Sequence, residues 1–206
     1  MKKTLVLLVV LCISLYTFGQ QRARLFDVPD SKTMTELEEK VRKFGEGLEK
    51  LGTTDAVSWE QKNHIRTDIM PGLFVKMNER YMLTSSGAGG SKITKRLMPS
   101  YLLNLQNQSK KKLNKRIEYD LAFDIYSGRE KFEWKFFKKH PDGSEEYHAE
   151  IRMYQTYAVH TVSGVEILYS YKEIDKKVIK AIKLVYPNGD IATGLGDVTR
   201  IERLNY

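Results

Sequence analysis

The spacing of hydrophobic residues changes midway along the chain, from a helical period to an alternating one. The first set recurs at steps of three and four, which places it on one face of a helix: Met34, Leu37, Val41, Phe44, Leu48 and Leu51. Thr33 and Glu36 have the spacing of a capping box, and Gly52 suits a helix end. We therefore expect a helix whose apolar stripe is buried against the rest of the domain.

Two shorter helices are expected before the alternating region. One is opened by a second capping box at Ser58 and Gln61, and the other covers residues 99–108, where a proline stands in the first turn. Between these helices the pattern indicates a short strand at 81–84 and a Gly/Ser-rich loop at 85–91.

From residue 112 onward hydrophobic and polar residues alternate, which is the pattern of strands with one buried face. Strands are expected at 113–126, 132–136, 144–159, 165–172, 177–186 and 191–204. Two of these segments exceed the usual strand length, so the sheet should twist and curl. Helices followed by a long antiparallel sheet predict an α+β domain, with the N-terminal helices packed on one face of a curved sheet.

The first nineteen residues have the pattern of a cleavable secretory signal peptide. Two lysines precede an apolar run over 5–16, and small residues stand before Gln20. The run is shorter than the roughly 18 residues of a membrane-spanning helix. We therefore expect cleavage after Gly19 and export to the periplasm or to the outside of the cell.

Composition predicts one domain behind this segment. Residues 20–30 would form a short leader, and residues 31–206 a single α+β domain. The one cysteine, Cys12, lies inside the apolar run, so neither disulfides nor thiol chemistry are expected in the mature domain. The formal net charge of +8 favours contact with anionic surfaces.

The order of elements resembles that of the NTF2-like (SnoaL-like) superfamily of cone-shaped α+β domains. In the matching stretch a helix ends at the segment 70–74, a short strand follows, and a helix containing residues 101–105 precedes a long strand. The resemblance covers about residues 57–204. It implies helices over a concave sheet with a cavity between them. Because the family includes enzymes, small-molecule binders and interaction modules, it leaves the function open.

Aromatic residues at the inward positions of the strands are the candidates for lining such a cavity. They are Tyr119, Phe123, Trp134, Tyr147, Tyr157 and Tyr169. The same side chains could simply fill a core, so an open cavity lined by tyrosine hydroxyls would distinguish ligand binding from packing. A site of this kind would suit an apolar or ring-shaped ligand.

Basic residues gather just after the third predicted helix. The cluster consists of Lys110, Lys111, Lys112, Lys115 and Arg116. Cations complement the dipole at a helix C-terminus, but five in seven residues exceed what a helix end needs. An edge that faces an anionic surface is therefore an alternative role. No nucleic-acid recognition motif accompanies the cluster, so no specific nucleic acid is expected.

The sequence offers no arrangement typical of a metal site, a cofactor or a catalytic nucleophile. His148 and Glu150 share a strand face but lack a third ligand. The glycine-rich segment 87–92 lacks P-loop spacing, because a serine separates its last glycine from the lysine. Asp120 and Asp124 alternate with the aromatic row and should face solvent. We therefore expect no metal and no cofactor.

The leading hypothesis is an exported, non-catalytic binding or protein-interaction domain, whose partner is a small molecule or a protein. One alternative is a small-molecule enzyme, such as an isomerase, dehydratase or hydrolase, that uses the same cavity. Another is an electrostatic binder of an anionic surface polymer or lipid. A cavity His, Asp or Glu within hydrogen-bond reach of a tyrosine or of a second carboxylate would favour the enzyme. Large apolar residues on the outer sheet face would favour a homodimer through the sheet or a docked protein.

Overall fold

The computed structural model describes residues 31–86, 92–112, 114–124, 132–163 and 165–204. The predicted signal peptide and leader, and most of the predicted Gly/Ser loop, lie outside these residues. Among the helices that are described, none combines the length and the hydropathy needed to cross a membrane.

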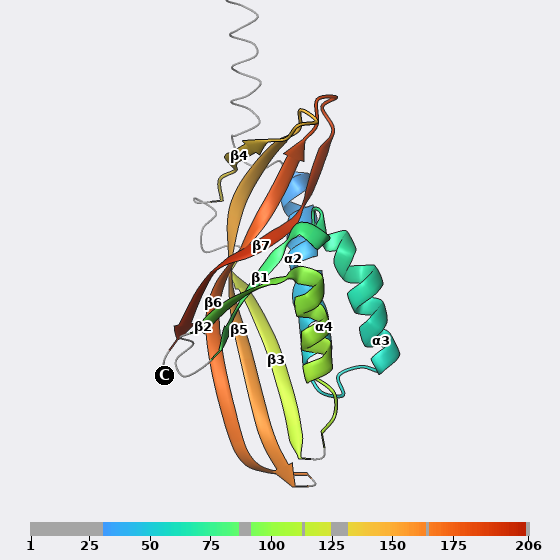
Figure 1. Cartoon of the computed structure of the whole chain (residues 1–206), viewed down its shortest axis with the longest axis vertical. Helices are drawn as coiled ribbons and strands as arrows, with labels where there is room; N and C mark the ends of the chain where they lie inside the picture. Colours follow the sequence, from blue (N-terminus) through green and yellow to red (C-terminus); the bar gives the residue numbers. More distant parts are fainter. Residues whose placement is uncertain (1–30, 87–91, 113, 125–131, 164, 205–206) are drawn as a thin grey trace, which may run out of the picture.

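In the described part of the chain, α-helices cover one face of a curved sheet, which confirms the predicted α+β class (Figure 1). The helices are α2 (Ser31–Gly52), α3 (Trp59–His64) and α4 (Met98–Gln108), with helical turns η1 (Ile65–Ile69), η2 (Met70–Leu73) and η3 (Met77–Glu79). The strands are β1 (Tyr81–Ser86), β2 (Lys92–Leu97), β3 (Lys115–Asp124), β4 (Lys135–Lys139), β5 (Glu145–Ser163), β6 (Glu166–Val185) and β7 (Ile191–Leu204).

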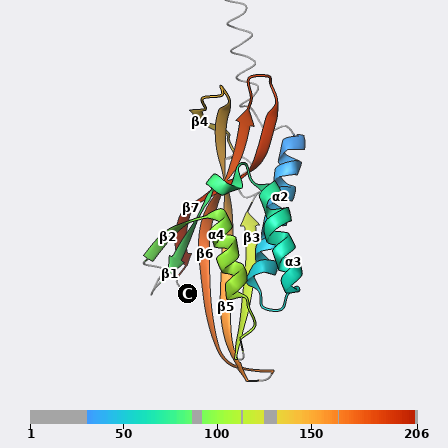
Figure 2. The ribbon, with the colours of Figure 1, turned by 45° about the vertical axis from the view of Figure 1, so that its right-hand side comes forward.

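The sheet has the order β2-β1-β7-β6-β5-β3. Strand β4 pairs with residues 145–148 of β5, and β3 pairs with residues 152–161 of the same strand. Neighbouring strands are antiparallel except β1 and β7, which are parallel. The β5–β6 hairpin is the longest part of the sheet and curves beneath the helices (Figure 2). Its curvature produces a concave face against which α2 and α4 pack.

Three details differ from the sequence prediction. The strands expected at 165–172 and 177–186 form one strand, because the residues between them include no glycine or proline that would turn the chain. Strand β2 was not predicted, since its side chains are mostly exposed and carry no alternating apolar pattern. Strand β4 begins at Lys135, so Trp134 precedes it.

The predicted stripe of α2 forms the centre of the core. Leu37, Val41, Phe44 and Leu48 are all buried, which confirms the expectation. The ring of Phe44 packs edge-on against Phe74, with centroids 5.4 Å apart. Helix α2 begins at Ser31, so Thr33 lies inside the helix rather than at its cap.

The second predicted capping box is present at the start of α3. The N–H of Gln61 donates to the Ser58 Oγ at 3.2 Å, and the N–H of Ser58 donates to the Gln61 Oε1 at 2.9 Å. These two bonds satisfy backbone donors that the first turn of a helix leaves open.

The segment that follows α2 closes the outer edge of β3. The N–H of Thr54 donates to the carbonyl oxygen of Ile117 at 2.9 Å, and the N–H of Ile117 donates to the Thr54 Oγ1 at 3.0 Å. The N–H of Tyr119 donates to the Thr53 Oγ1 at 3.2 Å. Thr53 and Thr54 therefore satisfy backbone groups on the outer edge of β3 that would otherwise be open to another strand.

Candidate functional site

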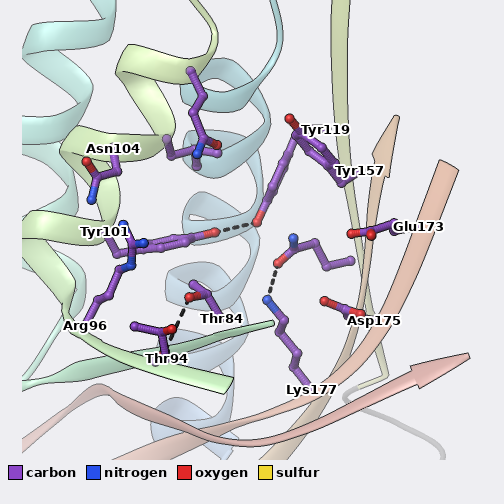
Figure 3. Close-up of a pocket in the computed structure, with 13 residues that line it drawn as sticks. Thr84, Thr94, Arg96, Tyr101, Asn104, Tyr119, Tyr157, Glu173, Asp175 and Lys177 are labelled. Carbon is purple, nitrogen blue, oxygen red and sulfur yellow. Dashed lines mark hydrogen bonds between the residues drawn. The ribbon is translucent and has the colours of Figure 1, made fainter. Parts of the chain in front are cut away.

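A cavity of about 220 Å³ lies between α4, the β1–β2 hairpin and the concave face of the sheet (Figure 3). Pockets for drug-sized ligands are usually about 300–1,000 Å³, so this one suits a smaller molecule. It is lined by Thr84, Thr94, Arg96, Tyr101, Asn104, Leu105, Gln108, Tyr119, Gln155, Tyr157, Glu173, Asp175 and Lys177.

The floor of the cavity follows directly from strand register. Tyr119 of β3, Tyr157 of β5 and Glu173 of β6 stand opposite one another in one row. The next row towards the middle of the sheet places Gln155 opposite Asp175. Because residues two apart on a strand share a face, these rows present their side chains to the same cavity.

Two tyrosine hydroxyls meet at the inner wall of the cavity. The Tyr101 Oη on α4 lies 2.7 Å from the Tyr119 Oη on β3, and both residues are buried. Burial, with a contribution from the negative charge of Asp175, raises the pKa of Tyr101 to about 12 and the pKa of Tyr119 well above 10. Both phenols are therefore neutral at ordinary pH. Only one hydroxyl hydrogen is used between them, so the pair has a second one to donate.

The cavity also contains buried charge of both signs. Asp175 is 5 % exposed and Lys177 is 2 % exposed. The Lys177 Nζ donates to the Gln155 Oε1 at 2.6 Å. Burial and the nearby carboxylate of Glu173 raise the pKa of Tyr157. The lining thus offers hydrogen-bond donors, hydrogen-bond acceptors, a cation and carboxylates.

The charged lining was missed in the sequence because a strand break was expected between 172 and 177. Continuing the alternation from Lys177 back through Asp175 to Glu173 would have placed all three opposite β5, in the same rows as Tyr157 and its neighbours. The sequence does indicate a continuous strand, because residues 173–176 include no glycine or proline that would turn the chain.

The structure brings only part of the predicted aromatic set to the cavity. Tyr119 and Tyr157 line it, whereas Trp134 and Tyr147 are buried in another part of the core. Tyr169 shares a sheet face with Tyr157 by register but is 63 % exposed. Phe123 pairs with a buried β5 methionine in the register, and its side chain lies outside the described residues.

The predicted basic cluster lies where α4 ends and β3 begins, and its side chains are exposed. The Lys110 Nζ lies 4.7 Å from the centre of the Trp59 ring, and the Lys111 Nζ lies 3.3 Å from a carboxylate oxygen of Asp55. The Arg116 Nε lies 3.8 Å from a carboxylate oxygen of Glu118. Lys112 and Lys115 form a backbone bridge at the start of β3. The cluster is therefore partly compensated by neighbouring acids.

A second polar cluster lies on the opposite, convex face of the sheet. The carboxylate of Glu146 is 1 % exposed and lies 2.7 Å from the His140 Nε2, 2.6 Å from the His148 Nε2 and 3.5 Å from Arg80. Burial raises the pKa of Glu146, but the two histidine hydrogen bonds and the Arg80 charge outweigh it, so the net shift is downward. The ring of Phe137 stacks on His148 with centroids 4.1 Å apart.

His148 lies on the sheet face opposite Tyr157, and Phe137 and Glu146 bury most of its side chain. Within the ranges that the structure describes, no three His, Cys, Asp or Glu residues are arranged to hold a metal ion.

Comparisons of the chain with models of protein families, with curated proteins and with solved structures returned no match.

Proposed function

We propose that the protein is an exported, non-catalytic binding domain of NTF2-like type, and that its cavity takes a small polar molecule. The observation that carries this proposal is the cavity of about 220 Å³ bordered by α4, the β1–β2 hairpin and the concave sheet. Helices over a curved sheet, with the short strand β1 and the helix α4 before the long strands, agree with the arrangement that the family resemblance predicts.

The lining favours a polar ligand over the apolar or ring-shaped one expected from the aromatic pattern. The tyrosine pair supplies a hydroxyl donor, Gln155 and Asn104 supply amides, and Asp175 and Lys177 supply opposite charges (Figure 3). A small molecule that carries both a cationic and an anionic group, or several hydroxyls, matches these groups best. An apolar ligand would displace water from these polar groups and offer them no hydrogen bond in return, which is costly.

The tyrosines favour binding over catalysis. A phenol whose pKa lies near 12 is neither a ready proton acceptor nor a ready proton donor near neutral pH. The hydrogen bond between Tyr101 and Tyr119 joins two phenols of this kind. Both are instead suited to hold a polar group by neutral hydrogen bonds. The enzyme alternative draws its support from the buried Asp175, whose charge acts on both phenols.

Native mass spectrometry of the purified protein tests the proposal. We expect a small molecule to be carried through purification and to be lost from Thr94→Trp, because Thr94 lines the cavity and an indole there would fill it. Ile93→Trp is the matched control, since Ile93 is the next residue of β2 and is 57 % exposed. Equal retention by the two variants would contradict the proposal. Chemical conversion of the carried molecule during incubation would support the enzyme instead.

Export is tested separately by N-terminal sequencing. Protein recovered outside the cytoplasm should begin at Gln20 or within a few residues of it, because the predicted cleavage follows Gly19. An intact Met1 on that protein would exclude a cleaved signal peptide.

A further inference from the structure

The end of the β5–β6 hairpin carries a dense group of exposed apolar side chains, which we name the hairpin tip: Val165, Ile167, Leu168 and Tyr169. Their exposed fractions are 103 %, 53 %, 61 % and 63 %. Elsewhere in the described residues, exposed large apolar side chains stand singly, as Ile93 does, or in a pair, as Phe136 and Phe137 do. Exposed apolar side chains gathered at one end of a protein indicate an interaction site there.

The hairpin tip projects at one end of the molecule, beyond the helices (Figure 1, Figure 2). The connection from α4 to β3 lies at the same end in both views. The N–H of Val162 donates to the carbonyl oxygen of Asn114 at 3.1 Å, so the two segments are joined there.

Strand register places the basic cluster beside the hairpin tip. Lys115 stands opposite Thr161, and Arg116 stands opposite His160, a few residues before the turn of the hairpin. Lys112 precedes them in the connection from α4. The tip contributes one acidic residue, Glu166, and other acids lie beside Arg116 and Lys111. An apolar end is therefore bordered by a group of cations.

We propose that the hairpin tip docks the protein on the surface of a membrane that contains anionic phospholipids. The apolar side chains of the tip enter the boundary between headgroups and acyl chains, where burial of apolar area drives binding. Lys112, Lys115 and Arg116 lie alongside and contact lipid phosphates, to which each basic residue near the surface adds attraction. This surface is separate from the cavity, so the docking does not depend on the cavity ligand.

The geometry favours a lipid surface over a second copy of the chain. Among the described residues, the part of β6 from 166 to 173 has no partner in β7. A second copy of the chain could pair along this open edge only if β6 were a regular strand there. The register of β5 and β6 instead shifts between Thr161 and Val162, which places an irregularity within the tip. Val165 stands at the turn itself, and an apolar residue at the extreme end of a hairpin suits insertion rather than side-by-side pairing.

Vesicle co-sedimentation of the mature protein tests the docking. Binding should be strong to phosphatidylcholine vesicles that contain about a third phosphatidylglycerol, weak to phosphatidylcholine alone, and reduced by salt. Ile167→Glu/Leu168→Glu should weaken binding by roughly ten-fold or more, whereas Ile93→Glu, an exposed apolar residue on β2, should not. Lys112→Glu/Lys115→Glu should likewise weaken it by roughly ten-fold or more, compared with Lys135→Glu/Lys139→Glu on the exposed strand β4.

A second readout reports insertion directly. The emission of Leu168→Trp should shift to shorter wavelength on addition of the anionic vesicles and should be quenched by brominated acyl chains, while Ile93→Trp should show neither change. Equal binding of the tip variant and the wild type would overturn the proposal. It would also be overturned if Ile167→Glu/Leu168→Glu changed the mass of the protein in gel filtration but left vesicle binding intact, because the tip would then be a protein interface.

Discussion

The two halves of β6 have similar apolar content but opposite surroundings. From Ile174 to Val185 the strand lies beside β7, and Ile179, Ala181 and Ile182 are fully buried. From Glu166 onward the other half runs past the helices, and Ile167, Leu168 and Tyr169 are all more than half exposed. Alternation tells which residues share a face of a sheet. Burial depends on how far the covering elements extend along it.

This difference also separates the two proposed sites. Tyr157, Glu173 and Asp175 stand at the border between the covered and uncovered lengths of the hairpin, where α4 lies over the sheet without filling the space. The cavity is therefore a partly filled core, whereas the hairpin tip is apolar surface without a cover. The first suits a small ligand, and the second suits an extended surface.

The largest expected effect comes from weakening the packing of α2, the helix that covers the sheet. Phe44 of α2 is fully buried and packs on Phe74, so Phe44→Ala should lower the free energy of unfolding by about 3–5 kcal/mol. Leu103→Ala on α4 is the control, because Leu103 is 43 % exposed and should lose less than about 0.5 kcal/mol. Urea denaturation measures both. A loss of that small size for Phe44→Ala would mean that α2 does not cover the sheet.

The same substitution on the two halves of β6 tests the comparison directly. Ile179→Ala should cost about 2–5 kcal/mol, since it leaves a cavity in the core. Ile167→Ala should cost no more than about 0.5 kcal/mol, because the side chain is already exposed. Denaturation of the two variants in parallel gives the difference. Similar losses would show that Ile167 has a cover that the described residues do not include.

Much of the fold was predictable from the sequence. The α2 stripe, the capping box at Ser58 and the alternating strands are local patterns, and the structure confirms them. Gly143 and Gly189 lie between segments that were predicted as consecutive strands, and both adopt the positive φ that suits a turn there. Strand β2 carries no such pattern, and its place follows only from pairing with β1.

The site was harder to predict because it depends on distances along the sheet. Tyr119, Tyr157 and Tyr169 share a face by register, but only the first two lie beneath α4. The sequence pattern does not indicate how far along the sheet a covering helix extends. Trp134 belongs to the core outside the cavity for a related reason, since it precedes β4 and so does not follow the strand parity assumed for it.

A smaller effect is expected at the tyrosine pair. Tyr119→Phe removes one hydroxyl from a hydrogen bond of 2.7 Å and should cost about 0.5–1.5 kcal/mol. Because burial raises the folded pKa of both phenols, their contribution to stability is full below pH 10 and is lost at higher pH, for Tyr101 as the pH rises through about 12. Unfolding measured at increasing alkaline pH should therefore show a shallower decline for Tyr119→Phe. An unchanged decline would contradict the buried, neutral pair.

The smallest expected effect is on the loss of stability at acid pH, and it involves His148 on the convex face of the sheet. His148 stands opposite Ile182, and burial lowers its pKa below 6.5 although the hydrogen bond with Glu146 opposes the shift. The unfolded chain therefore binds a proton more readily than the folded chain does. The contribution of His148 is complete above pH 6.5 and is lost as the pH falls through the folded pKa.

His148→Gln should consequently flatten the dependence of unfolding free energy on pH between about pH 7.5 and 5. The pKa of Glu146 is lowered from its ordinary value of 4.5, so this carboxylate affects stability below that pH and contributes little within this window. Lys180 and Arg80 also face the cluster, and their positive charges disfavour a protonated imidazole. Urea denaturation at four or five pH values measures the slope. If the variant and the wild type lose stability in parallel, His148 takes up its proton equally in both states, and the covered half of the sheet is open to solvent on its convex face.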